Sequence, residues 1–414
     1  MAQTFVSGSA REAGFDPTRL NRIAAFLEGR IASGLLPHAQ ILVSRDEQPV
    51  AFGSIGNATQ DGAPLKDDAL FRIASMTKPV TSVAFMMLVE EGLVALDTPV
   101  SQVLPEFENL TVRTGGGEGG APFATRPAEG PMRMIDLLRH TSGLTYSFQQ
   151  QSPIDAAYAA QKLDVFQQPR TSDEYIAALA ALPLEFSPGT GWNYSVSTDV
   201  LGIVVERLSA LSLAEFFESR IFVPLGMTDS FFEVPSSHQS RLTDAWQLDD
   251  AKTRTLYDRG QSSRWRLASG SYSGGGGLVS STQDYHRFCR MLLRHGELDG
   301  VRLLSPKTVA LMMANHLPGG GNLAGASQSL FSESQNTGIG FGLGFAVTQD
   351  PVAAMLPGSA GECYWGGILS TFFFIDPLEG IIAIFMTQVM PSSAVAVRRE
   401  LKTLIYAALT DSRA

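Results

Sequence analysis

The sequence predicts an α+β fold whose antiparallel sheet is built from strands near both ends of the chain and flanked by helices. β-rich runs broken by turn residues occur near the start and again from Met355 onward. Between them, roughly over residues 80–260, helical patterns and loops dominate. We therefore expect a sheet domain formed by residues 1–80 plus 260–414 and an inserted, mainly helical domain formed by residues 81–259.

The first expected elements are a helix over residues 17–33 and a β-hairpin directly after it. The run AQILVSRDEQPVAFGSIG, residues 39–56, contains two β-rich segments separated by the turn-like letters RDEQ. Further on, two glycine-rich stretches interrupt the helical patterns. Thr114–Gly130 is expected to be a mobile loop, and Ser271–Gly277 a tight turn that precedes a helix.

Strands return in the last part of the chain. GIGFGLGF, Gly338–Phe345, alternates glycine with bulky residues, which favours a strand whose glycine side lies against another backbone. Residues 361–389 contain three β-rich segments, the last two split by the turn DPLEG, and residues 392–409 are expected to form a closing helix.

Composition excludes several classes of protein. A chain of 414 residues exceeds the usual size of one compact core, and 44% hydrophobic residues can bury a large one. The net charge of -10, with no basic run, argues against a nucleic-acid partner. Cys289 and Cys363 form no CxxC pair, so we expect buried thiols and no metal site. The start lacks a signal-peptide pattern and no apolar stretch could span a membrane, which predicts a cytoplasmic protein.

One candidate for chemistry lies in FRIASMTKPVTS, residues 71–82, where Ser75 and Lys78 stand three positions apart at the start of an apolar helical pattern. Pro79 has no amide for the carbonyl of Ser75, so it is tolerated only near a helix start. The free amides and the dipole there favour negative charge beside the serine hydroxyl. Lys78 projects from the same face, where a desolvated amine could accept the serine proton.

Two further stretches of the sequence support a catalytic interpretation of Ser75 and Lys78. The first is SPGTGWNYSVSTDVLG, residues 187–202, in which a Pro-Gly turn places Tyr194 at the start of another expected helix. YWGGIL, residues 364–369, places Gly366 and Gly367 inside a β-rich segment, where missing side chains permit close approach of a ligand to the backbone. Taken alone, the tyrosine is explained as well by a hydrophobic contact and the glycines by a β-bulge.

The three motifs in this order resemble the serine β-lactamases and penicillin-binding proteins, in which SxxK is a signature. Within that superfamily the chain looks most like the class C-like carboxylesterases called family VIII esterases. Their SxxK, YSx and WGG motifs are similar to the segments quoted above, and the flanking LLRHTSGL and DVLG are similar too. The resemblance covers residues 17 to 408 and implies a β-lactamase/transpeptidase-like fold with the active site between the two domains.

The resemblance also implies a role for each matching residue. Ser75 would be the nucleophile, Lys78 its proton partner, and Tyr194 the group that shuttles the proton to the leaving group. The backbone amides of Ser75 and Ile368 would form the oxyanion hole. Trp365, with Gly366, Gly367 and Val196, would line the substrate site. No cofactor or metal is implied.

Two departures from the β-lactamase pattern indicate esters as substrates. Val196 stands where those enzymes have the asparagine of Tyr-x-Asn, and Trp365 where they have the lysine of Lys-Thr-Gly. A site without those two polar groups should prefer neutral, apolar acyl groups. We expect a serine carboxylesterase that hydrolyses small, short-chain acyl esters, with weak or no β-lactam hydrolysis.

Other interpretations stay open at this point. An acyltransferase of the same fold shares the nucleophile and the base, and a class C-type β-lactamase or a non-catalytic sensor or assembly protein has the same architecture. No GxSxG elbow is present, and His140 in RHTSGL is interpreted as a structural hydrogen-bonding residue rather than a triad base. The protein is expected to be a monomer or a small homo-oligomer.

Overall fold

The computed structural model describes residues 5–164, 170–267, 271–328 and 337–413. Within these residues the largest sheet has the strand order β11-β12-β13-β14-β15-β1-β2, and every neighbouring pair in it is antiparallel. The strands of this sheet are β1 (His38–Arg45), β2 (Gln48–Gly56), β11 (Ile339–Phe341), β12 (Ala346–Thr348), β13 (Cys363–Gly366), β14 (Phe372–Asp376) and β15 (Ile381–Met386).

The centre of the sheet joins the two ends of the chain. Strand β15 pairs with β1 in a register that runs from Gln40 opposite Met386 to Arg45 opposite Ile381. At the end of this pairing the buried Arg45 guanidinium forms an ion pair of 2.9 Å with the carboxylate of Glu379. The expected sheet built from sequence-distant strands is therefore confirmed.

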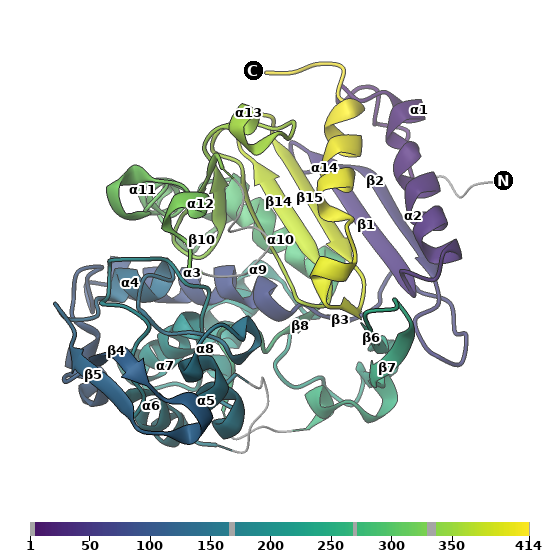
Figure 1. Cartoon of the computed structure of the whole chain (residues 1–414). Coiled ribbons are helices and arrows are strands. Elements are labelled where there is room, and N and C mark those ends of the chain that lie inside the picture. The colour runs from purple at the N-terminus through teal and green to yellow at the C-terminus, as the bar shows by residue number, and fades with distance from the viewer. Residues whose placement is uncertain (1–4, 165–169, 268–270, 329–336, 414) are drawn as a thin grey trace.

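Helices cover both faces of this sheet, which explains why β14 and β15 are apolar and buried along their whole length. Helix α10 (Thr282–Leu293) packs against β1, β14 and β15 on one face. Helices α1 (Pro17–Leu20), α2 (Arg22–Ala32) and α14 (Arg398–Ala407) pack together on the other, as Figure 1 shows. The helix expected over residues 17–33 is present but breaks at Asn21, and the closing helix expected over residues 392–409 begins later, at Arg398.

The middle of the chain forms a separate group of mostly helical elements beside one end of the sheet (Figure 1). Its helices are α3 (Thr77–Glu90), α4 (Met134–Leu138), α5 (Pro153–Gln161), α6 (Ser172–Ala180), α7 (Ser197–Ser209), α8 (Leu213–Phe217) and α9 (Val223–Leu225). Helix α3 packs against α7, and α4 also packs on α7. The division of the chain near residues 80 and 260 into two domains remains a prediction.

The remaining elements are short. They are the strands β3 (Phe71–Arg72), β6 (Ala245–Leu248), β7 (Arg254–Asp258), β8 (Val279–Ser280), β9 (Glu297–Leu298), β10 (Val301–Arg302) and β16 (Val389–Met390), and the helices α11 (Pro306–Met312), α12 (Leu323–Ala326) and α13 (Pro351–Ala354). Strand β3 pairs with β8, which ties the segment before Ser75 to the segment before α10.

The prediction of a mobile loop over residues 114–130 was wrong. β4 (Thr111–Gly116) and β5 (Phe123–Pro127) form an antiparallel hairpin with a register shift between Arg113 and Gly115. Four glycines of the turn, at 116, 117, 119 and 120, have positive φ angles. The glycines therefore adopt the left-handed conformations that the turn between the two strands requires, and they do not make this segment a loop.

The glycine-rich run Gly338–Phe345, expected to form a strand, does so only over Ile339–Phe341 (β11), and residues 342–345 form a bend before β12. A Cβ on Gly342 would meet the backbone carbonyl oxygen of Met312, so this glycine does lie against another backbone. Both cysteines are buried and free, as the sequence indicated. In the part of the chain that the structure describes, no helix is long and apolar enough to cross a membrane.

Candidate active site

Ser75 lies in a single 3₁₀ turn, Ala74–Met76, that leads directly into α3. The residue before it, Ala74, has a φ of 46°, a left-handed conformation that costs an L-residue with a side chain about 1–2 kcal/mol. Ser75 is buried but, at 8% exposure, is slightly more accessible than its neighbours Ala74 at 3% and Met76 at 0%. The strained turn therefore presents the hydroxyl at the edge of the protein interior, as expected for a reactive group at a helix start.

Lys78 is fully buried one turn along, and its ammonium nitrogen has three acceptors among the described residues. Lys78 Nζ lies 3.2 Å from Ser75 Oγ, 3.1 Å from the hydroxyl oxygen of Tyr146 and 2.7 Å from the carbonyl oxygen of Gly275. Three acceptors match the three N–H groups of an ammonium. In the neutral form, the amine can use its lone pair to accept the Ser75 proton.

Tyr194 completes the group that the sequence predicted. It lies just before α7 and is 3% exposed, and Lys78 Nζ stands 4.7 Å from the centre of its ring. Gln149 donates a hydrogen bond of 3.0 Å to the carbonyl oxygen of Tyr194, which fixes the backbone at this position. Ser75, Lys78 and Tyr194 therefore meet in one place, although 119 positions of sequence numbering separate the first from the last.

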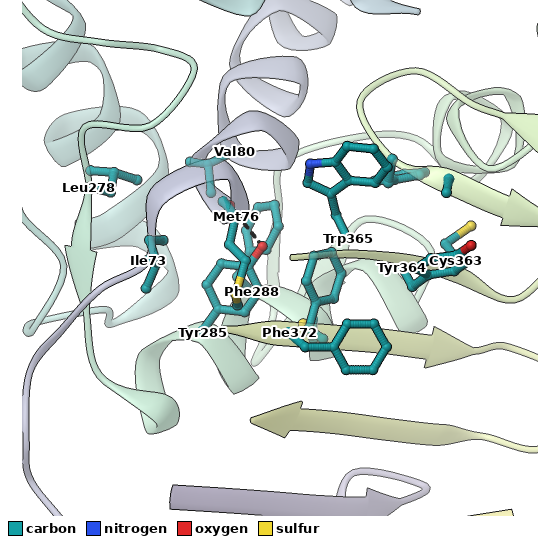
Figure 2. Packing of buried hydrophobic residues seen from close by; sticks show 14 of the residues in the cluster. Ile73, Met76, Val80, Leu278, Tyr285, Phe288, Cys363, Tyr364, Trp365 and Phe372 are labelled. Atoms are coloured by element: carbon teal, nitrogen blue, oxygen red, sulfur yellow. Dashed lines mark hydrogen bonds between the residues drawn. The ribbon is translucent and has the colours of Figure 1, made fainter. Parts of the chain in front are cut away.

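Trp365 reaches the same place from the sheet. Its indole N–H donates to the hydroxyl oxygen of Tyr194 at 3.3 Å, and the two rings lie 5.3 Å apart. The indole also packs edge-on against Phe341 and is 1% exposed. In Figure 2, Trp365 on β13 lies at the end of the sheet nearest Met76, the last residue of the serine turn, and Val80 on α3. That Trp365 forms a wall of the acyl pocket remains a prediction.

The glycines of the YWGGIL motif allow β13 to end directly against the serine turn. A Cβ on Gly367 would lie 2.6 Å from the carbonyl oxygen of Ile73 and 3.1 Å from the Cβ of Ala74. A Cβ on Gly366 would lie 2.5 Å from the Arg398 guanidinium carbon. Ile368 follows Gly367 in the chain, so its amide comes directly after the point where β13 lies closest to the serine turn. Its side chain is partly buried.

Val196 is placed differently from the other predicted residues. It is fully buried at the start of α7, and its amide donates to the carbonyl oxygen of Thr145 at 3.2 Å. The apolar side chain is thus part of the core that supports Tyr194. Its contact with substrate remains a prediction.

Two residues near Lys78 were missed by the sequence analysis. Tyr146 stacks on Phe148, and its hydroxyl lies 3.5 Å from a carboxylate oxygen of Asp199 on α7. Burial raises the pKa of Tyr146 well above its usual value, and the Asp199 charge adds to this. Burial also raises the pKa of Asp199, an effect that the charge of Lys78 opposes. The one signal in the sequence for these two residues was that Asp199 lies in the first turn of the helix that follows Tyr194.

His140 has the structural role that the sequence suggested. Its Nδ1 lies 3.3 Å from Ser195 Oγ, and its ring packs edge-on against Tyr194 with 4.9 Å between ring centres. Burial, followed by the nearby charge of Lys78, holds the pKa of His140 well below its usual value. A neutral imidazole therefore supports the tyrosine ring from behind.

This arrangement can move a proton between the Ser75 hydroxyl and a buried amine, which has the Tyr146 hydroxyl and the Tyr194 ring beside it. Together with an antiparallel sheet covered by helices on both faces, it defines the class of serine hydrolases with the β-lactamase fold. The chain belongs to the β-lactamase family, whose model, described as Beta-lactamase, matches residues 23–407. The resemblance to the family VIII esterases of this superfamily is confirmed as well.

Curated relatives match most of the chain. It is 38% identical over 368 residues to Protein Rv1367c of Mycobacterium tuberculosis (strain H37Rv), covering 88% of each chain. It is 31% identical over 403 residues to Esterase EstB of Burkholderia gladioli, covering 91% of this chain and 94% of that one. Among solved structures, the hydrolase EstCE1 superimposes with a TM-score of 0.78 at 24% identity, over 95% of this chain and 99% of that chain, which shows the fold.

Proposed function

We propose that this protein is a serine carboxylesterase that hydrolyses short-chain acyl esters through an acyl-enzyme on Ser75. The observation that carries the proposal is the distance of 3.2 Å between Lys78 Nζ and Ser75 Oγ, inside a buried group that includes Tyr194. The similarity to an esterase over nine-tenths of the chain supports the same activity.

In the acylation step, Ser75 Oγ attacks the ester carbonyl carbon while its proton passes to Lys78 Nζ. The tetrahedral oxygen receives hydrogen bonds from the amides of Ser75 and Ile368, each worth about 3 kcal/mol in related acyl transfer. Collapse breaks the bond to the alcohol oxygen, which takes a proton through Tyr194. Water then attacks the acyl-enzyme by the same steps in reverse order, and the carboxylic acid leaves.

The preference for esters over β-lactams follows from the groups around Tyr194. A buried valine at 196 and an indole at 365 replace the amide and ammonium that would hold a charged β-lactam. Each lost hydrogen bond costs about 1–3 kcal/mol, so the two together predict a deficit of about a hundredfold or more in kcat/KM for β-lactams. Neutral short-chain esters do not depend on those groups.

The test compares p-nitrophenyl butyrate with nitrocefin on one preparation, with Ser75→Ala as the control. We expect ester turnover that Ser75→Ala abolishes, nitrocefin turnover at least about a hundredfold lower in kcat/KM, and attachment of a fluorophosphonate to Ser75 seen by intact mass. If nitrocefin matches the ester, the protein is a β-lactamase. If Ser75 takes no label and no ester is cleaved, the protein is not an esterase.

Added alcohol distinguishes hydrolysis from acyl transfer in the same assay. A hydrolase gives mainly butyrate when methanol is present at low concentration, whereas an acyltransferase gives mainly the methyl ester. Product analysis by chromatography therefore decides between the two activities, which share every residue named above.

A further inference from the structure

The glycine-rich turn over residues 271–277, which the proposed reaction does not itself use, is attached to a carboxylate of α7. Asp199 accepts hydrogen bonds from Ser273 Oγ at 2.5 Å and from the amide of Gly275 at 3.0 Å. A Cβ on Gly275 would lie 2.9 Å from the carboxylate carbon of Asp199. Glycine at 275 therefore leaves room for this carboxylate against the backbone.

Asp199 is connected to Lys78 by two routes. The first runs through the Tyr146 hydroxyl, which lies 3.5 Å from Asp199 Oδ2 and 3.1 Å from Lys78 Nζ. The second runs through Gly275, whose amide bonds Asp199 and whose carbonyl oxygen accepts from Lys78 Nζ at 2.7 Å. Two of the three acceptors around the lysine are therefore held in place by one carboxylate.

The charge of Asp199 also sets the direction of the Tyr146 hydroxyl. An ionised carboxylate can only accept, so the hydroxyl hydrogen points toward Asp199 and its lone pairs remain for Lys78 Nζ. An asparagine at 199 could donate to the same oxygen instead, which would take one acceptor away from the lysine. The titratable or charged groups that face Asp199 are Lys78 on α3, Tyr146, Asp164 after α5 and Tyr175 on α6.

We propose that Asp199 is a positioning residue for the proposed esterase reaction: it aims Lys78 Nζ at Ser75 through Tyr146 and Gly275, and its negative charge balances the ammonium formed when Lys78 takes the serine proton. This inference rests on the proposed function of Ser75 and Lys78. In this scheme Asp199 neither takes up nor gives up a proton. The proton moves only between Ser75, Lys78, Tyr194 and the leaving alcohol.

The test is Asp199→Asn, assayed with p-nitrophenyl butyrate and by the rate of fluorophosphonate labelling of Ser75. We expect kcat and the labelling rate to fall together by about a hundredfold, with KM within about threefold, because an acceptor of the proton partner is lost and not a substrate contact. The acidic limb of the pH–rate profile should move to lower pH, because the ammonium form loses a neighbouring negative charge.

A double-mutant cycle separates this role from general destabilisation. Because Asp199 acts in part through the Tyr146 hydroxyl, Tyr146→Phe together with Asp199→Asn should cost less than the product of the two single effects. Asp284→Asn removes another buried carboxylate, which bonds Ser230 and the amide of Asp229, and should leave kcat within about threefold. Should Asp199→Asn fail to fold, Ser273→Ala removes one donor to Asp199 and should lower kcat several-fold.

The outcomes distinguish this inference from the function on which it rests. If the natural protein cleaves the ester and Asp199→Asn does so at the same rate with an unshifted acidic limb, the role of Asp199 is wrong and the esterase stands. Fully multiplicative effects in the cycle overturn the route through Tyr146. A natural protein that neither cleaves the ester nor takes the label overturns the proposed function itself.

Discussion

At the scale of single residues, the hydroxyl of Tyr194 is held by an indole where a β-lactamase would offer an ammonium. Trp365 Nε1 lies 3.3 Å from that hydroxyl oxygen. A hydrogen bond of this kind strengthens when the oxygen gains negative charge, as it does when a tyrosine gives up its proton. The indole can therefore stabilise negative charge on the Tyr194 oxygen without attracting a charged substrate.

Replacing Trp365 with phenylalanine tests this hydrogen bond. An aromatic ring remains, but the N–H donor and the five-membered ring of the indole are lost. We expect kcat for p-nitrophenyl butyrate to fall about tenfold or more with little change in KM, since hydrogen bonds to charged groups contribute about 1.5–3 kcal/mol. Steady-state kinetics measures both constants.

Trp192 provides the matched control for that variant. Its ring stacks on Tyr194 at 6.3 Å, but its indole nitrogen has no hydrogen-bond partner among the described residues. Trp192→Phe should therefore keep kcat within about threefold. Equal losses in the two variants would mean that the rings matter for packing and that the Trp365 donor is unimportant.

At the scale of elements, the site depends on the end of β13 lying against the turn before α3. The contact is between backbones, because Gly367 brings no side chain to the carbonyl oxygen of Ile73. The hydroxyl of Thr371 also donates to that carbonyl oxygen at 3.3 Å. Arg398 on α14 donates to the carbonyl oxygen of Gly367 at 2.7 Å, which holds the end of the strand from the other side.

Gly367→Ala should separate the two elements that form the proposed oxyanion hole. Its Cβ would lie 2.6 Å from a backbone oxygen that cannot rotate away, so one of the two segments has to shift. We expect kcat to fall about a hundredfold or more, because the loss of one oxyanion donor has that effect in related enzymes. Thermal unfolding should show a lower Tm.

Gly29→Ala serves as the control, because a Cβ on this glycine of α2 would meet nothing within 4 Å. Its kcat should be unchanged and its Tm equal or slightly higher, since alanine is the better helix former. A Gly367→Ala protein with normal kcat would place the oxyanion hole away from Ile368.

At the scale of the whole molecule, buried ionisable groups on β1 and on α10 give opposite pH dependences of stability. Burial lowers the pKa of His38 and of His286 to about 4. Burial raises the pKa of Asp284 to about 6. Between about pH 4 and 6.5 the unfolded chain binds a proton at each histidine that the folded protein does not, whereas Asp284 binds its proton in the folded protein. Acid therefore destabilises through the histidines and stabilises through Asp284.

His286→Gln isolates one of these contributions. For the natural protein, His286 should lower the free energy of unfolding by about 1.4 kcal/mol for each pH unit between about pH 6.5 and 4. Glutamine does not titrate there and can still bond Ser44 Oγ, which lies 2.8 Å from His286 Nε2. Urea unfolding at several pH values should show that this part of the slope is lost.

His295→Gln, a change at an exposed histidine, should leave the slope as it is in the natural protein. A His286→Gln protein with an unchanged slope would mean that His286 is protonated in the folded state.

The sequence was sufficient for the sheet and for the motifs, but not for the surroundings of Lys78. The hairpin near residue 46 and the strands after residue 361 could be predicted because β-rich runs and turn residues are local signals. The hairpin of β4 and β5 was missed because its glycines serve a turn and not a flexible loop. Tyr146 carries no local signal, and the only signal for Asp199 is its place shortly after Tyr194. Only the packing of α7 against α3 and the glycine turn reveals that they surround the lysine.

Because β1 pairs with β15, strand β1 is synthesised long before the strand with which it pairs. After Arg45 leaves the ribosome, synthesis of the chain up to Ile381 takes on the order of tens of seconds at about 5–20 residues per second. During that time one edge of β1 lacks its partner and is a possible site of aggregation. Until Glu379 is synthesised, Arg45 at the end of β1 also lacks its ion-pair partner. An unpaired charge at a strand edge opposes incorrect pairing with another strand. The sheet can therefore be completed only after β15, which ends at Met386, has been synthesised.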